Sequence, residues 1–571
     1  DKTGTLTKNE MTVTAILAGG GRYEVTGVGY HPEGAIRREG EKVSPDSSRA
    51  LEEITRAGIL CNESRLIEHG KNWRIEGDPT EGALLVVAIK AGLDPGCLRD
   101  EAEALDSIPF ESERQFMATL HQIPDQGHVV YLKGAVERVL AMCEAEMDPE
   151  GKIIPFDRAK ANQSAEALAK EGLRVLAFAK KSLPGQTTLH PRDVETGMVF
   201  LGLQAMIDPP RAEAIAAVKA CQDAGISVKM ITGDHALTAQ AIARQMSIGG
   251  DRPLVIEGAQ LAKLSDEELK GIALKSDVFA RVIPEQKLRL VKTLQGQGAV
   301  VAMTGDGVND APALKQADIG IAMGLNGTEV AKDAADMVLI DDNFASIEAA
   351  VEEGRGVYDN LRKFIIWTLP TNGGEGLLLI IAIAAGLVLP ILPLHLLWIN
   401  MTTSVALGTV LAFEPKEAGL MKRPARAPNE PILTGDMMAR IVYVSVLMVI
   451  GAYILYFWEL SRGLDLVAAR TVVASVVVAV EIAYLFNCRS LSRPVWEVGF
   501  FSNRWALWGV LIMVSLQLAF VYLPPMQWLF QTASVPLESW FDVAVVVLVV
   551  YLLVETEKWL RRESFFRKAR D

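Results

Sequence analysis

The chain has 571 residues, of which 50% are hydrophobic and 22% charged, and its formal net charge is −13. This length predicts several domains, and the composition excludes a disordered chain or a small disulfide-stabilised protein. Acidic residues predominate in residues 1–360, which argues against binding to nucleic acid. Residues 361–571 carry most of the long apolar runs, so we expect an acidic soluble front half and a membrane-embedded back half. The five cysteines are scattered without a C-x-x-C pair, which fits a reducing cytoplasm.

The chain opens on the motif D-K-T-G-T-L-T at residues 1–7. Because it begins inside a motif and without a methionine, we expect it to be the C-terminal part of a longer protein. An aspartate carboxylate can attack a phosphoryl group when Mg²⁺ and a lysine neutralise the charge. Asp1 is therefore a candidate nucleophile with Lys2 beside it, and the high-energy acyl phosphate that it would form suits the driving of work.

Residues 1–360 alternate apolar strands with amphipathic helices, which is typical of an α/β domain. A strand predicted at 226–231 runs into T-G-D at 232–234, and another at 299–303 runs into T-G-D-G-V-N-D at 304–310. Ligands of open α/β sheets bind beyond the carboxyl ends of the strands, so we expect both acidic loops in one crevice. There the glycines let the backbone approach phosphate, and the carboxylates can hold Mg²⁺.

Six apolar runs are each long enough to cross about 30 Å of hydrocarbon. They lie near residues 364–388, 392–413, 439–459, 467–487, 505–523 and 540–557. Lysine and arginine concentrate in segments 414–438, 488–504 and 558–571, which the positive-inside rule assigns to the cytoplasm. We therefore predict a multi-pass membrane protein whose soluble domains and both chain ends are cytoplasmic.

Several polar side chains fall inside these runs, where an ionisable group indicates a functional site by default. Glu375 follows Pro370 and a pair of glycines that should loosen the first helix and free backbone carbonyls. Asn372 lies three residues from Glu375 and is expected on the same helix face. The second run contains N-M-T-T-S at 400–404, and the fourth contains Glu481. Oxygen atoms of this kind suit a hard cation.

Together these motifs resemble those of the P-type ATPases, ion pumps with a haloacid-dehalogenase-like phosphorylation domain, over essentially the whole chain. The resemblance implies ATP and Mg²⁺ as cofactors, phosphorylation of Asp1, and Mg²⁺ contacts from Asp1, Thr3 and Asp306. The other catalytic residues that it implies are Lys2, the phosphate loop Thr232, Gly233 and Asp234, the phosphoryl-contacting Lys287 of P-E-Q-K, and Asn309 and Asp310 beside Asp306.

The resemblance also implies a nucleotide-binding insert between residues 14 and 202. Glu81, in G-D-P-T-E, matches the residue that contacts adenine, and Phe110 matches its stacking ring. The remaining implied ATP contacts are Lys133 and Gly134 of K-G-A, Arg114 and Arg174 near the phosphates, and Asp208 and Arg211 of D-P-P-R. Gln115 stands where the family often carries a lysine.

Six spanning helices after the phosphorylation domain resemble the cation, proton and lipid branches of the family, and D-P-P-R resembles the first two of these. By resemblance to the sarcoplasmic-reticulum calcium pump, the positions that match its cation site are Asn372, Glu375, Asn400, Thr403 and Glu481. Ser404 stands where that pump has an aspartate shared by two calcium ions. This difference leaves room for one divalent ion, or for Na⁺ or K⁺.

We therefore expect an α/β haloacid-dehalogenase-like phosphorylation domain at 1–13 and 203–345 with an α+β nucleotide-binding insert at 14–202. A stalk at 346–363, an all-α bundle of six transmembrane helices at 364–557 and a basic cytoplasmic tail at 558–571 should follow. The expected partners are ATP, the transported cation, the lipid bilayer, and an upstream actuator domain with four further spanning helices. Without these upstream parts, we expect that the chain does not complete a transport cycle.

The expected function is ATP-driven cation transport through an aspartyl phosphate, in the plasma membrane of a prokaryote, with Ca²⁺ as the leading ion. A Na⁺, K⁺ or Mg²⁺ pump is the nearest alternative. A phospholipid flippase and a membrane-anchored phosphatase of the dehalogenase type are alternatives of other classes. A non-catalytic regulator is disfavoured because every expected catalytic carboxylate is present.

Overall fold

The computed structural model describes residues 2–568 apart from residues 3, 9, 45–46, 70–71, 112, 125 and 492. It divides into two compact units, residues 1–348 and residues 349–571, and each unit is described by itself. The first unit holds the mixed α/β part of the chain, and the second is entirely helical.

An 11-stranded, mainly antiparallel sheet forms the larger part of the first unit. Its first strand, β1 (Thr12–Ala18), pairs with its last, β13 (Met198–Ile207). The chain therefore enters and leaves this part of the unit on neighbouring strands, and the residues between them form one insert. The strand order is β4-β3-β2-β1-β13-β12-β9-β8-β7; β10 pairs with β13, and β11 pairs with β10. The other strands are β2 (Gly21–Val25), β3 (Ile36–Arg38), β4 (Glu41–Lys42), β7 (Glu103–Ile108), β8 (Phe116–Ile123), β9 (Gly127–Gly134), β10 (Cys143–Met147), β11 (Ile153–Pro155) and β12 (Arg174–Ser182).

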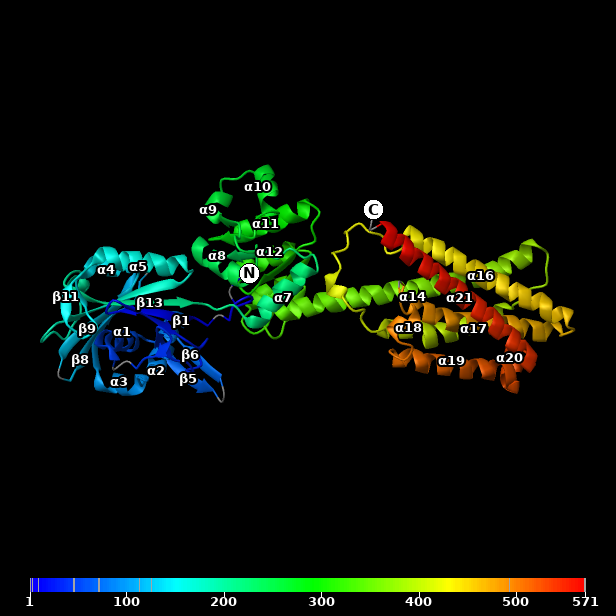
Figure 1. Cartoon of the computed structure of the whole chain (residues 1–571), viewed down its shortest axis with the longest axis horizontal. Helices are drawn as coiled ribbons and strands as arrows, with labels where there is room; N and C mark the ends of the chain where they lie inside the picture. The colour runs from blue at the N-terminus through cyan, green and yellow to red at the C-terminus, as the bar shows by residue number, and fades with distance from the viewer. Residues whose placement is uncertain are drawn as a thin grey trace. The chain divides into compact units, whose positions relative to one another are not determined.

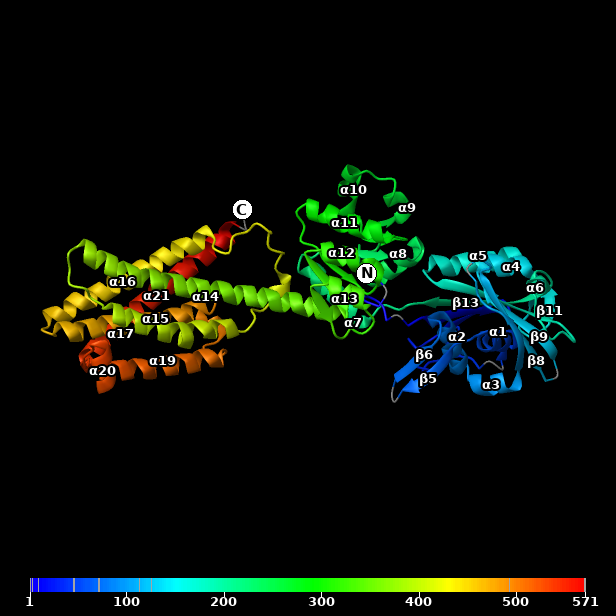
Figure 2. The same cartoon turned by 180° about the vertical axis from the view of Figure 1, so that it is seen from behind.

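Helices cover both faces of this sheet (Figures 1 and 2). One face packs against α1 (Arg49–Leu60), α2 (Pro79–Lys90) and α3 (Pro95–Glu101), the other against α4 (Val136–Met142) and α5 (Arg158–Lys170). The start of α2 is fixed by its sequence, because Asp78 accepts hydrogen bonds from the Thr80 and Glu81 amides and proline follows it. Smaller elements are β5 (Arg65–His69), β6 (Asn72–Glu76) and α6 (Pro191–Val194).

The rest of the first unit contains two parallel three-stranded sheets. One has β14 (Met230–Thr232), β16 (Val278–Ala280) and β15 (Val255–Glu257), and the other has β17 (Ala302–Gly305), β18 (Ile319–Met323) and β19 (Met337–Leu339). Both strands predicted before the acidic loops are therefore present but begin three or four residues later than expected. The helices are α7 (Ala212–Asp223), α8 (Ala236–Gln245), α9 (Gly258–Leu261), α10 (Asp266–Ala273), α11 (Pro284–Gly296), α12 (Ala311–Gln316) and α13 (Glu329–Ala334), with a 3₁₀ turn at Val308–Asp310.

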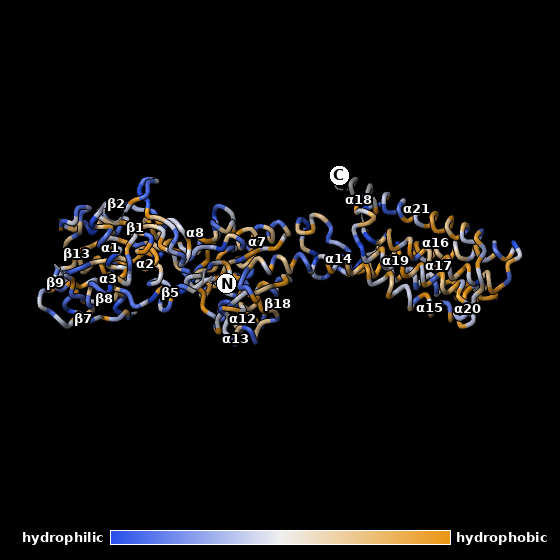
Figure 3. The backbone as a smooth tube through the Cα atoms, turned by 90° about the horizontal axis from the view of Figure 1, so that it is seen from below, coloured by the Kyte–Doolittle hydropathy of each residue, from blue (hydrophilic) through white to orange (hydrophobic). Residues whose placement is uncertain are grey.

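The part of the chain that the structure describes has six helices long and apolar enough to cross a membrane, as predicted, and the first of them begins at the end of the first unit. Their spans are Phe344–Ala384 (α14), Pro393–Phe413 (beginning with α15, Pro393–Thr403), Gly435–Ser461 (α16), Leu466–Cys488 (α17), Arg504–Tyr522 (α19) and Leu537–Arg561 within α21 (Leu537–Lys568). Short helices α18 (Val495–Val498) and α20 (Pro524–Phe530) lie between them. In Figure 3 the tube of these spans is predominantly hydrophobic in colour. The expected fold class is confirmed.

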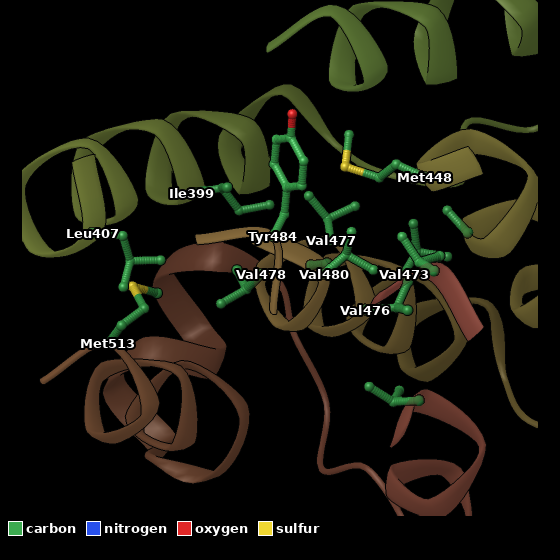
Figure 4. Packing of buried hydrophobic residues seen from close by; sticks show 14 of the residues in the cluster. Ile399, Leu407, Met448, Val473, Val476, Val477, Val478, Val480, Tyr484 and Met513 are labelled. Atoms are coloured by element: carbon green, nitrogen blue, oxygen red, sulfur yellow. The ribbon is translucent and has the colours of Figure 1, made fainter. Parts of the chain in front are cut away.

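Helix α17 is the most enclosed span, since 67% of its most apolar window is buried inside the bundle. Most of its valines, among them Val473, Val477 and Val480, are almost fully buried, although Val467 near its start is 37% exposed. Figure 4 shows these three valines in one cluster with Ile399 of α15, Met448 of α16 and Met513 of α19. This cluster belongs to the hydrophobic core of the helical unit.

The first spanning helix is not broken at Pro370, although proline and two glycines were expected to loosen it. α14 continues for 41 residues through this position. Proline has no N–H, so the Ile366 carbonyl one turn earlier loses its helical partner. That carbonyl instead accepts a hydrogen bond of 3.0 Å from the Tyr484 hydroxyl of α17. The expectation of a freed carbonyl is therefore confirmed, whereas that of a loosened helix is wrong.

The irregular backbone occurs instead in the second span. After α15 the chain forms a π-helical segment at Ser404–Gly408 and then a 3₁₀ segment at Thr409–Phe413. The close approach of neighbours requires glycine here, because a Cβ on Gly408 would lie 2.9 Å from the ring of Phe364. π segments inside helices frequently mark functional sites. The segment begins at Ser404, one of the residues predicted to contact the cation.

The β1–β13 pairing gives a stability prediction at Gly202, whose φ is +145° and whose added Cβ would overlap the Leu17 carbonyl oxygen. Replacing Gly202 with alanine should lower the free energy of unfolding by about 1–3 kcal/mol, measured by thermal or urea unfolding. The control is Gly185→Ala, because Gly185 has φ +79° but no atom within 4 Å of its Cβ position. Equal losses in the two variants would show that backbone strain, and not the overlap with Leu17, sets the cost.

Candidate active site and cation site

The loops predicted to bind phosphate and Mg²⁺ follow the carboxyl ends of two parallel strands. β14 ends at the buried Thr232, and its hydroxyl accepts a 3.1 Å hydrogen bond from the Asp234 amide. β17 ends at Gly305, directly before Asp306. Ligands of open α/β sheets bind beyond the carboxyl ends of the strands, so both loops lie where a ligand would bind.

Lys2 of the first motif is buried between two carboxylates. Its ammonium lies 2.7 Å from Asp234 and 3.7 Å from Asp208, and its side chain is 5% exposed. Asp208 also accepts a hydrogen bond of 2.5 Å from the Thr7 hydroxyl, while Arg211 donates to the Thr7 carbonyl. The structure therefore joins the D-K-T-G-T-L-T, T-G-D and D-P-P-R motifs through one lysine.

A second lysine serves the other acidic loop. Lys287, at the start of α11, lies 2.6 Å from Asp310. The Gly307 amide donates to the other oxygen of Asp310 over 3.2 Å, which closes the loop on itself. Asn309, predicted to support the metal, lies on the exposed side of this turn.

Asp306 lies between these two groups. A Cβ on Gly4, whose φ is +72°, would be 3.1 Å from the Asp306 carboxylate, so the first motif contacts the metal loop directly. Burial raises the pKa of Asp306, and the neighbouring Asp310 carboxylate raises it further. A bound cation would lower the pKa of Asp306 again, because it favours the charged carboxylate. Asp1 and Thr3, the predicted nucleophile and its neighbour, lie outside the described residues.

Mg²⁺ is usually held by one or two carboxylates together with substrate phosphates. No group of three metal-ligating side chains occurs among the described residues. The half-buried Asp306 carboxylate, together with substrate phosphates, fits the smaller requirement of Mg²⁺.

In the insert, Glu81 and Lys133 form a tight pair of 2.5 Å. The other oxygen of Glu81 accepts hydrogen bonds from the Glu63 amide at 3.0 Å, and from the amide and hydroxyl of Ser64 at 3.1 and 3.0 Å. Both carboxylate oxygens are therefore engaged by the protein. The sequence placed Glu81 against adenine, whereas in this structure it fixes Lys133 and the chain at 62–64.

The other predicted ATP contacts of the insert are Phe110, Arg114 and Arg174, whereas Asp208 and Arg211 lie with Lys2 and Thr7. Phe110 is 61% exposed and is thus available for stacking, and Arg114 pairs with Glu111 at 3.0 Å. Gln115 has a left-handed backbone with φ 62°, and its carbonyl leaves no room for a side chain at Gly134. Arg174 donates to the Thr80 hydroxyl at 3.5 Å.

In the second unit, Glu375 and Asn400 meet between α14 and α15. The Asn400 amide donates to Glu375 over 2.5 Å, and the other Glu375 oxygen is buried without a partner among the described residues. Glu481 of α17 is 1% exposed, and one of its oxygens likewise lacks a described partner. The carboxylate of Glu481 interacts with both Glu375 and Thr403. The structure therefore brings together four of the six predicted side chains.

The other two predicted side chains lie apart from this group. Asn372 is exposed although Glu375, three residues away, is buried, and Ser404 is exposed at the start of the π segment. The Thr403 hydroxyl also donates to the Ile399 carbonyl of its own helix at 2.9 Å.

The crevice and the bundle define the class of the protein, which is a dehalogenase-like phosphoryl-transfer domain on a polytopic membrane bundle. Three family descriptions match successive parts of the chain. They are "P-type ATPase, cytoplasmic domain N" at residues 50–213, "haloacid dehalogenase-like hydrolase" at 156–318 and "Cation transporting ATPase, C-terminus" at 388–560.

Similar proteins agree with these descriptions. "Probable cation-transporting ATPase F" of Mycobacterium tuberculosis (strain ATCC 25618 / H37Rv) is 52% identical over 98% of the chain and 63% of its own length. "Cation-transporting ATPase pma1" of Synechocystis is 49% identical over 95% of the chain and 61% of its own length. "Calcium-transporting ATPase" of Bacillus subtilis is 36% identical over the same shares, 95% and 61%. The chain belongs to the P-type ATPases, and it spans less than two thirds of the length of these relatives.

The Glu81–Lys133 pair gives a prediction that does not depend on function. Glu81→Gln places an amide NH₂ against either the Lys133 ammonium or the donors of Glu63 and Ser64, so it should cost about 1–3 kcal/mol of unfolding free energy. Urea unfolding of the purified protein measures this loss. The matched control is Glu63→Gln, whose side chain is exposed and should change stability by less than about 0.5 kcal/mol. Equal stability of the two variants would contradict the pairing.

Proposed function

We propose that the protein transports a cation at the expense of ATP through a phosphorylated aspartate at Asp1. One observation carries the proposal. The same chain has a crevice in which Lys2 and Lys287 balance carboxylates, and a bundle in which Glu375 and Asn400 form a buried polar pair. A phosphatase anchored in a membrane needs only the crevice, whereas a pump needs both.

In the proposed reaction, a carboxylate oxygen of Asp1 attacks the γ-phosphorus of ATP, the bond to the bridging oxygen breaks, and ADP leaves. Lys2 and Lys287 offset part of the negative charge of the crevice, which reduces its repulsion of an anionic substrate. Thr232, Gly233 and Asp234 line the edge to which the phosphoryl group is delivered. Asp1, Thr3 and Asp306 would hold Mg²⁺, which when bound supplies positive charge to the phosphate oxygens.

ATP is proposed to bind on the insert beside Lys133. The exposed ring of Phe110 offers a face for adenine, and Lys133, held by Glu81, presents a fixed positive charge. Arg114 and Arg174 supply further charge for the phosphates.

The proposed cation site is the group of Glu375, Asn400, Thr403 and Glu481. Buried oxygens without partners inside an apolar bundle are costly unless they bind a cation or a proton, which is why these side chains support transport. Ca²⁺ is the first choice because relatives at 36% identity are named calcium-transporting. Ser404 in place of a shared aspartate reduces the negative charge, and so favours one ion over two.

We also propose the setting of the reaction. The loops rich in lysine and arginine assign the soluble unit to the cytoplasm, and the bacterial relatives favour the plasma membrane of a prokaryote. The whole protein would add an actuator domain and four further spanning helices, as partners of the part described here. α14, which begins beside the crevice and carries Glu375, provides a continuous connection between phosphorylation and cation binding.

Phosphoenzyme formation tests the proposal. The intact gene product in membranes, treated with labelled ATP and Mg²⁺, should form acid-stable phosphoenzyme that Asp1→Asn abolishes, because only a carboxylate can form the acyl phosphate. Labelling that requires micromolar Ca²⁺ would identify the ion, and labelling that requires Na⁺ would assign the protein to the monovalent pumps. Labelling that is indifferent to every cation but lost in Asp1→Asn would favour a lipid flippase. Hydrolysis of small phosphoesters without ATP would favour a phosphatase.

The cation site gives a second test. Glu375→Gln should raise the activating concentration of the cation about 10-fold or more, since it removes the charge of one direct ligand, or about 1.4 kcal/mol of binding. The control is Glu459→Gln on α16, because Glu459 is also fully buried but is not in the group around Asn400. A similar change in both variants would mean that buried charge in general, and not this site, sets cation affinity.

A further inference from the structure

A second buried aspartate lies at the same edge of the sheet as the metal loop. Asp342 follows β19 and is 1% exposed. Its carboxylate accepts four hydrogen bonds, from the Gly324, Leu325 and Asn326 amides at 2.7, 2.9 and 2.8 Å and from the Asn326 side chain at 2.8 Å. Its hydrogen bonds, as far as the described residues show them, come from residues outside the proposed reaction.

All four donors belong to one loop, residues 324–328, which follows β18. Consecutive amides that converge on one carboxylate form an anion-binding concavity, and here the anion is a side chain of the protein itself. Hydrogen bonds to a charged acceptor are the stronger kind, so Asp342 fixes the conformation of this loop. Asp342 itself has a left-handed backbone with φ 49°.

The same loop supports Asp306. At its end, the Thr328 amide donates a 2.8 Å hydrogen bond to the Asp306 carbonyl. Since β17, β18 and β19 are adjacent in that order, the loops after the three strands are also neighbours, and they carry Asp306, the 324–328 loop and Asp342 respectively. Asp342 is therefore linked to Asp306 in two steps. Its carboxylate holds residues 324–326, and Thr328 of the same loop holds the Asp306 carbonyl.

The other neighbour of Asp342 is the start of α14 at Phe344. The preceding Asp341 accepts a 2.6 Å hydrogen bond from Ser346, and Asn343 accepts one of 3.0 Å from the Ala345 amide. These two side chains cap α14, while Asp342 between them accepts its hydrogen bonds from the 324–328 loop. The turn at 341–343 thus serves both elements at once.

We propose that Asp342 is a positioning residue that latches the 324–328 loop, and through Thr328 the backbone of Asp306, to the first turn of α14. The latch sets the position of the metal ligand relative to the helix that carries Glu375. Its role in the reaction rests on the proposed function, whereas the latch itself can be measured without catalysis.

The test compares Asp342→Asn with Asp341→Asn in the intact gene product. Asparagine has nearly the same shape, but its NH₂ group opposes the donors of Asn326, so amides 324–328 should lose protection in hydrogen exchange. The apparent Mg²⁺ requirement for phosphorylation should rise about 10-fold, the usual effect of losing a partner behind a metal ligand. Asp341→Asn should alter only protection at the start of α14. Unchanged protection of residues 324–328 in Asp342→Asn would overturn the proposal.

A second pair of variants isolates the bond to Asp306. Thr328 has φ −67°, which proline can adopt, so Thr328→Pro removes its N–H together with its capping hydroxyl. Thr328→Ala also removes the hydroxyl, together with the γ-methyl, but keeps the N–H. The proposal expects a raised Mg²⁺ requirement in the proline variant and a normal one in the alanine variant. Equal requirements in both would overturn it, even if Asp342→Asn fails to fold.

These outcomes separate the latch from the function. If the wild-type protein forms no phosphoenzyme, the proposed function fails, and hydrogen exchange still decides whether Asp342 holds the loop. If protection is lost in Asp342→Asn but the Mg²⁺ requirement is unchanged, the latch has only a structural role and the proposal is wrong.

Discussion

Carboxylates gathered at the ends of parallel strands repel one another, and the first unit depends on how that repulsion is balanced. Asp208 and Asp234 share Lys2, and Asp310 has Lys287. The described part of the chain gives Asp306 no lysine of its own, although it lies in the middle of the group. The two lysines thus offset the charge of only two of these four carboxylates, and the described part of the crevice stays negative.

The helical bundle also buries carboxylates, and it compensates their charge to different degrees. Glu414 and Arg489 are both buried and paired at 2.9 Å, and Asn503 satisfies the carboxylate further at 2.7 Å. Such a fully satisfied group stabilises the packing of helix ends and offers nothing to a ligand. Glu375 and Glu481 each keep an oxygen without a described partner, so they retain the capacity to bind. Unpartnered oxygens alone do not identify a cation site, because both oxygens of the buried Glu459 on α16 also lack a described partner.

The sequence was sufficient for the parts of the fold that depend on local pattern. Apolar strands that end in acidic, glycine-containing loops, and six apolar runs of membrane length, could be located to within a few residues. Contacts between distant positions could not be predicted from such patterns, because nothing local marks Lys2 as the partner of Asp234 or Lys133 as the partner of Glu81. The π segment after Thr403 was also missed, since a run of N-M-T-T-S reads as an ordinary helix. Asp342 was overlooked for a similar reason, because D-D-N before a helix reads as a simple cap.

The hydrogen bonds around Pro370 have a consequence for the register of two helices. The Tyr484 hydroxyl donates to the Ile366 carbonyl that proline leaves free, and the Trp367 ring N–H donates to the Glu481 carbonyl at 3.1 Å. Two reciprocal bonds thus join α14 to α17, about two turns before Glu375 on the first helix and at Glu481 on the second. Sliding of one helix along the other by a single residue, about 1.5 Å, would break both bonds. Hydrogen bonds, as well as side-chain packing, therefore hold the register of α14 against α17.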